Sequence, residues 1–153
     1  MSTTDMNHNI VLTAEAHCDG PCGVYDPASM RIAAEAVVSM TKKLHALEPP
    51  AAGDKAALVA YNNTFSRYVA IKEEQATLAK DELLVLWTDY FKPVHLETYP
   101  DLHTTIWNAA KNLSACKVEC SLEHCEQLMA DVKKIHEIFW ASKGRQVEWY
   151  TAS

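Results

Sequence analysis

Apolar residues recur every three or four positions through most of the chain, which is the spacing of one face of an α-helix. The first such stripe follows Asp26 and Pro27, two residues that suit the N-cap and the first position of a helix. This stripe consists of Met30, Ala33, Val37, Met40, Leu44 and Leu47. Residues 48–54, EPPAAGD, are typical of a linker and end this first predicted helix.

Three more helical stripes follow the linker. The first, Leu58, Tyr61, Phe65 and Tyr68, opens a long helical region that extends towards Lys92 and Pro93, with a break near residues 80–81 left open. A third helix follows Pro100, with the stripe Leu102, Ile106, Ala110 and Leu113. Ser121 caps a fourth, with the stripe Leu122, Cys125, Met129, Val132, Ile135 and Phe139. The chain shows no strand-like alternation, so we expect an all-α fold, an antiparallel four-helix bundle.

Length, charge and composition exclude several classes of function. The chain has 153 residues, enough for one domain, and a formal net charge of −6, which argues against a nucleic-acid partner. No run approaches the ~20 apolar residues of a membrane span, so no membrane partner is expected. Residues 1–16 contain no Lys or Arg and do not resemble a secretory signal. We therefore expect a cytoplasmic protein, in which the five cysteines stay reduced.

Reactive side chains are concentrated in residues 17–27, HCDGPCGVYDP. Its two cysteines are four positions apart, but the glycines and the proline disfavour a helix and favour a tight loop with both sulfurs turned inward. Such a loop can chelate a metal through two thiolates. A structural zinc site would need a second pair of ligands, which Cys116, Cys120 and Cys125 can supply. The alternative is a capped surface turn with two incidental cysteines.

This segment closely resembles the hook of nickel-containing superoxide dismutase, in which the mature chain begins at the histidine. IKEEQATLAK (residues 71–80), VLWTDYFKPVHLETYPDLH (residues 85–103) and IFWASK (residues 138–143) are similar to later parts of that family, in the same order. The resemblance implies a homohexamer of four-helix bundles that holds one nickel ion per subunit. It also implies the reaction, in which superoxide is converted to oxygen and hydrogen peroxide through a Ni(III)/Ni(II) cycle.

The resemblance assigns the metal ligands. His17 would supply its α-amine and, in the oxidised state, an axial imidazole; Cys18 would supply a thiolate and its deprotonated backbone nitrogen. Cys22 would supply the second thiolate. Soft sulfur ligands and planar four-coordination suit nickel(II).

The resemblance also gives the first residues a function. While residues 1–16 are attached, the nitrogen of His17 is an amide and not an amine. The family removes this leader with a protease, so we expect cleavage between Ala16 and His17, which leaves a domain of residues 17–153.

Three residues are implied to be catalytic. Tyr25 and Tyr90 correspond to tyrosines beside the open face of the metal, where ordered water can deliver protons and bulky anions are kept out. Asp19 matches an aspartate inside the hook.

The chain departs from the family in the groups that support the axial imidazole. Ala33 stands where the family has a glutamate that holds the imidazole, and Gln75 stands where it has the arginine that supports this glutamate. Glu35 and Glu74 are candidates to compensate. The second hypothesis is therefore a non-catalytic relative that binds nickel or another soft metal without axial-histidine support.

Three cysteines lie where the family does not usually have thiols. Cys125 falls on an apolar stripe and is expected to be a buried thiol. Cys116 and Cys120 can approach each other near a helix end, as a disulfide, an auxiliary metal site, or neither.

Overall fold

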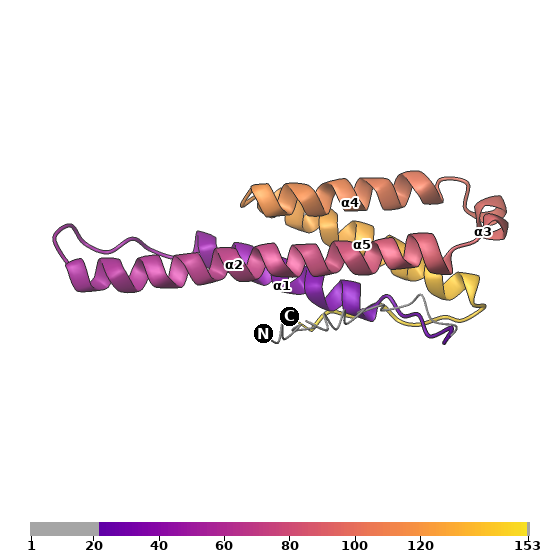
Figure 1. Cartoon of the computed structure of the whole chain (residues 1–153), viewed down its shortest axis with the longest axis horizontal. Helices are drawn as coiled ribbons and strands as arrows, with labels where there is room; N and C mark the ends of the chain where they lie inside the picture. The colour runs from indigo at the N-terminus through magenta and orange to yellow at the C-terminus, as the bar shows by residue number, and fades with distance from the viewer. Residues whose placement is uncertain (1–21, 153) are drawn as a thin grey trace, which may run out of the picture.

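A computed structural model describes residues 22–152, in which every regular element is a helix (Figure 1). The elements are α1 (Ala28–His45), α2 (Lys55–Val85), the π-helical turn η1 (Leu86–Tyr90), α3 (Pro93–Thr98), α4 (Leu102–Val118) and α5 (Leu122–Ser142). The all-α prediction is confirmed. Within the described residues, none of the helices has both the length and the apolar composition needed to cross a membrane.

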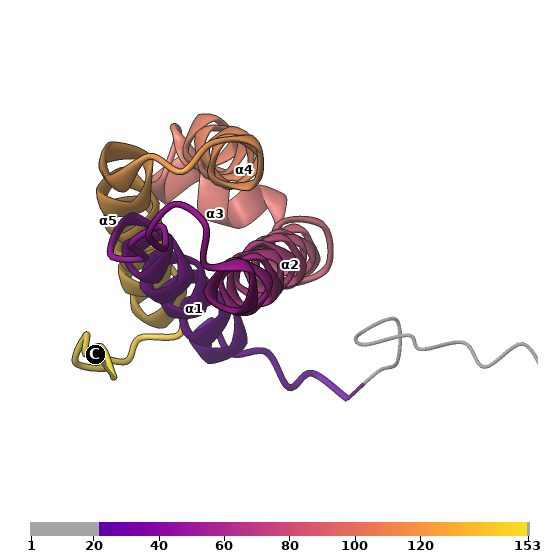
Figure 2. The same ribbon diagram turned by 90° about the vertical axis from the view of Figure 1, so that its left-hand side faces the viewer.

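The four long helices form the bundle, and each packs against two others in the ring α1–α2–α4–α5 (Figure 2). Helix α3 lies at one end and connects α2 through η1 to α4 (Figure 1). The short α3 and the π turn were not predicted. The core is built from the inward faces of all four long helices, with Met30, Val37, Leu83, Ile106, Leu128 and Phe139 among its buried members.

Two helix starts follow the predicted capping. The Asp26 carboxylate accepts a hydrogen bond of 2.8 Å from the Ala28 amide, although the helix begins one residue later than expected. Ser121 Oγ accepts from the His124 amide at 3.2 Å at the start of α5. Each side-chain oxygen satisfies an amide that has no partner within its own helix.

Helix α2 answers one open question and contradicts one expectation. It is continuous from Lys55 to Val85, so the break at residues 80–81 that the sequence leaves open is absent. Of the predicted stripe, Leu58 is 48% exposed and Phe65 is 41% exposed. The reason is length: α2 has 31 residues, whereas α1 has 18 and α4 has 17, so the first part of α2 extends past both neighbouring helices (Figure 1). Leu122 of the last stripe is also exposed, whereas Leu128 is buried.

The C-terminal segment, for which no role was predicted, packs against α1 and α5. The ring nitrogen Nε2 of His136 lies 3.0 Å from the Val147 carbonyl oxygen. The Arg31 guanidinium lies 4.3 Å from the centre of the Tyr150 ring, and the Ala152 amide donates to Glu35 Oε2 at 2.7 Å. The segment therefore covers one side of the bundle.

Candidate metal centre

Three of the six predicted site residues, His17, Cys18 and Asp19, lie outside the described residues. Of the predicted metal ligands, Cys22 is described and is an exposed free thiol. The next residue, Gly23, has a φ of +66°, a conformation that L residues with a side chain rarely adopt. The glycine thus allows the chain to turn sharply directly after Cys22.

The two predicted tyrosines lie together. The rings of Tyr25 and Tyr90 pack with their centroids 5.5 Å apart and an angle of 54° between their planes. Residues 22–27 are far in the sequence from η1, and this contact fixes the segment that carries Cys22 against the end of α2.

A π turn positions Tyr90. The Phe91 amide donates to the Leu86 carbonyl oxygen at 3.0 Å, a bond that spans five residues instead of four. One extra residue in a turn rotates the following side chains away from the direction that a regular α-helix would give them. Such turns are often found at functional sites. Sequence spacing alone does not reveal this local change of register.

Side chains from α3 and from the end of α5 surround Tyr90. Ser142 Oγ donates to the Phe139 carbonyl oxygen at 2.6 Å, so the Tyr90 hydroxyl is the donor in its 2.6 Å bond to Ser142 Oγ. The His95 ring stacks on Tyr90 with centroids 5.6 Å apart. The Lys143 ammonium lies 5.3 Å from the centre of the Tyr90 ring. No role was predicted from the sequence for Ser142, His95 or Lys143, although the motifs that carry the resemblance contain all three.

A cavity of about 180 Å³ lies beside Tyr25. Its lining residues are Val24, Tyr25, Asp26, Ser29, Glu82, Val85 and Leu86. The space is large enough for water and for a small anion, and Glu82 adds a carboxylate that was not predicted.

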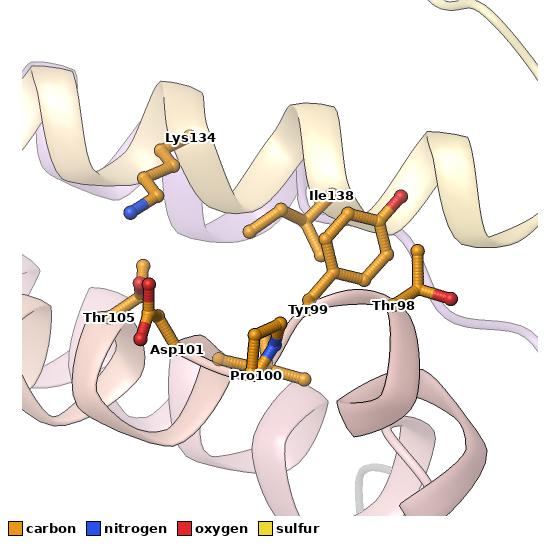
Figure 3. A pocket seen from close by; sticks show the side chains of 8 residues that line it. Thr98, Tyr99, Pro100, Asp101, Thr105, Lys134 and Ile138 are labelled. Atoms are coloured by element: carbon orange, nitrogen blue, oxygen red, sulfur yellow. The ribbon is translucent and has the colours of Figure 1, made fainter.

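A second cavity, of about 220 Å³, lies where the junction of α3 and α4 faces α5 (Figure 3). Ile138 and Tyr99 form an apolar side, and Lys134 and Asp101 bring opposite charges to it (Figure 3). Of the predicted site residues that the structure describes, Cys22, Tyr25 and Tyr90, none lines this cavity.

The two carboxylates predicted to compensate for the missing axial support, Glu35 and Glu74, lie in different surroundings. Ala33 is buried in the core and Gln75 is half-buried. Both carboxylate oxygens of Glu35 already have donors, because Oε1 accepts from Arg31 and Oε2 accepts from the Ala152 amide. Glu74 is exposed on α2. Glu35 is therefore held in a buried ion pair on α1.

The extra cysteines lie far from Tyr90. The Cys116 carbonyl oxygen accepts a hydrogen bond from Lys72, which lies 18 residues before Tyr90 and thus about 27 Å from it along the helix. The interpretation in which Cys116 and its neighbours complete a zinc site with residues 17–22 stays a prediction, because His17 and Cys18 lie outside the described residues. Within residues 22–152, no group of three or more His, Cys, Asp or Glu side chains is arranged to hold a metal ion.

Comparisons with known proteins agree with one family. Residues 12–143 match the family described as nickel-containing superoxide dismutase. Among curated proteins, the chain is 44% identical over 128 residues to "Superoxide dismutase [Ni]" of Streptomyces seoulensis, covering 84% of this chain and 88% of the relative. It is 39% identical over 132 residues to the protein of the same name from Streptomyces coelicolor, covering 86% and 92%.

Solved structures agree as well. A native nickel superoxide dismutase superposes with a TM-score of 0.72 at 38% identity, over 84% of this chain and 99% of the other. A structure with nickel ligation corresponding to the oxidised state superposes with a TM-score of 0.70 at 42% identity and the same coverage. The chain therefore belongs to the nickel-containing superoxide dismutase family.

Proposed function

We propose that this chain is a nickel-dependent superoxide dismutase, which converts superoxide to oxygen and hydrogen peroxide with one nickel ion per chain. His17, Cys18 and Cys22 are the proposed ligands. The observation that carries the proposal is the packing of Tyr25 on Tyr90, because it holds the segment with Cys22 beside a phenol, a cation and a small cavity. Both curated relatives are named as nickel dismutases, so the alternative of a non-catalytic metal-binding relative is not favoured.

The available donors fit nickel. Cys22 is an exposed free thiol, and the left-handed conformation of Gly23 turns the chain directly after it. Thiolates are soft ligands that nickel(II) binds well. When bound, nickel supplies the exchange of one electron with each of two superoxide ions.

The residues around the hook have separate tasks. The phenols of Tyr25 and Tyr90 hold water at the open face of the site and pass protons to the reduced product, and Asp19 supports the hook. Ser142 fixes the Tyr90 hydroxyl by accepting its proton in a hydrogen bond. The Lys143 ammonium over Tyr90 offsets the net charge of −6 locally and attracts the anionic substrate.

Tyr90→Phe should lower dismutation about tenfold or more while nickel binding stays at one ion per chain. The variant loses the hydroxyl that donates to Ser142 but retains the ring contacts with Tyr25 and Phe139. Nickel content and superoxide consumption at several pH values measure the two effects separately. A Tyr61→Phe variant, which changes a tyrosine on the first half of α2, is the control and should keep full activity. Unchanged activity of Tyr90→Phe would contradict the role given to this hydroxyl.

A free α-amine at His17 is required, so we propose that a protease removes residues 1–16 between Ala16 and His17. A chain produced to start at His17 should bind one nickel ion and consume superoxide. The matched chain with residues 1–16 attached should do neither, because its His17 nitrogen is an amide. If the trimmed chain takes up no nickel, or takes up nickel without dismutation, the proposed function is wrong.

We also propose that the chain assembles into a homohexamer and that it is cytoplasmic. The first half of α2 exposes apolar side chains that one chain leaves uncovered, namely Leu58, Val59 and Phe65. Leu58 and Phe65 are seven residues apart and thus share one face of the helix, which is the proposed contact with another subunit. The mass of the particle in solution tests the assembly.

A further inference from the structure

A pair of buried thiols lies where α4 ends and α5 begins. Cys116 is in the last turn of α4 and Cys125 is in the first turn of α5, and both side chains belong to the same buried core cluster. Cys116 is 1% exposed and Cys125 is 2% exposed. Both are free thiols, and the proposed dismutation uses neither of them.

A buried cation lies beside this pair. Lys72 is 2% exposed, and its ammonium donates to the carbonyl oxygens of Cys116, Lys117 and Glu119 at 2.8, 2.8 and 3.0 Å. All three ammonium protons are therefore used, and the positive charge is fixed at the C-terminal end of α4. A fixed cation and a hydrogen-bond donor both stabilise a thiolate.

The two thiols are not equivalent. The hydrogen bond from Cys116 and the charge of Lys72 lower the pKa of Cys125 to about 6, against the opposing effect of burial. The same hydrogen bond, burial and the neighbouring negative charge raise the pKa of Cys116. Cys125 is thus the nucleophile of the pair and Cys116 remains protonated.

We propose that Cys116 and Cys125 are a peroxide-oxidised dithiol that forms a reversible disulfide between α4 and α5. The Cys125 thiolate attacks one oxygen of hydrogen peroxide, the O–O bond breaks, and hydroxide leaves and is protonated to water. The Cys116 sulfur then attacks the sulfenic acid of Cys125; its proton leaves with the hydroxyl as a second water. In total, two thiols and one peroxide give one disulfide and two waters.

The family's reaction supplies the oxidant, since hydrogen peroxide is its product. Peroxide reaches the buried pair when residues 117–122, which join the ends of α4 and α5, open locally. This region includes the exposed Cys120. Cys120 is exposed and lies outside the core cluster that contains Cys116 and Cys125. The disulfide is therefore expected between the two buried thiols.

The test adds peroxide to the nickel-loaded enzyme, so that its result does not depend on dismutation. After removal of the peroxide, free thiols are alkylated and the protein is digested after Lys and Glu. Cleavage after Lys117 and Glu123 places Cys116, Cys120 and Cys125 on three different peptides. We expect a linked pair of the Cys116 and Cys125 peptides, which a thiol reductant separates.

Two variants sharpen the test. Cys120→Ser should form the same linked pair at an unchanged rate. Cys116→Ser should form none and should accumulate a Cys125 sulfenic acid that dimedone traps. The wild-type digest is decisive even if a variant fails to fold: alkylated Cys116 and Cys125 after peroxide treatment, or a disulfide that contains Cys120, would overturn the proposal.

Discussion

Cys22→Ser is expected to remove nickel binding and to lower superoxide dismutation by more than about 100-fold, because the loss of a direct ligand should exceed the ~10–100-fold that an outer-shell partner typically contributes. A serine hydroxyl does not ionise near neutral pH and is a harder donor than a thiolate, so it cannot replace the sulfur ligand. The nickel content of the purified chain and its rate of superoxide consumption measure the result. The helix content should not change, because Cys22 is exposed and lies before α1.

Cys120→Ser is the matched control. Cys120 is also an exposed free thiol, but it lies in the linker between α4 and α5. This variant should keep its nickel and its activity. Full nickel occupancy and full activity in Cys22→Ser would contradict the assignment of the hook as the metal site.

Lys72→Met should lower the free energy of unfolding by about 3 kcal/mol, one of the largest losses expected from a single change in this chain. Methionine fills a similar volume but donates no hydrogen bond, so three carbonyl oxygens at the end of α4 lose their buried donor. Denaturation in urea, followed by the helical circular dichroism signal, measures the difference.

Lys80→Met is the control for this prediction. Lys80 lies eight residues later on α2 and donates one hydrogen bond of 2.9 Å to Ser114 Oγ in a partly buried position. Its removal should cost less than about 1 kcal/mol. Equal losses in the two variants, or a more stable Lys72→Met, would show that the ammonium does not hold the end of α4 in place.

The sequence predicts those residues of the candidate metal centre that lie close together along the chain. Residues 17–27 combine a histidine, two cysteines and turn-forming residues in one short stretch, and this stretch carries the resemblance to the nickel family. The partner of Tyr25 is 65 positions away, and only the resemblance indicated it before the ring contact was seen. The catalytic and ligand roles of these residues stay predictions.

The surroundings of Tyr90 show why the rest was missed. A π turn changes the register within one helix, and the spacing of apolar residues does not record a single inserted residue. Ser142 and Lys143 reach Tyr90 from the end of α5, so their role depends on how two distant helix ends meet. The sequence alone therefore does not show that the end of α5 lies beside Tyr90.

The sequence by itself determined the four long helices and the hydrogen bonds of Asp26 and Ser121 at two of their starts, because these depend on interactions between residues a few positions apart. Only the tertiary structure decided which apolar stripe is core, since burial of one helix depends on how far its neighbours extend. It turned the stripe at Leu58 and Phe65 outward and the charged Lys72 inward. It also paired Cys116 with Cys125, where the helix ends bring two thiols and a cation together.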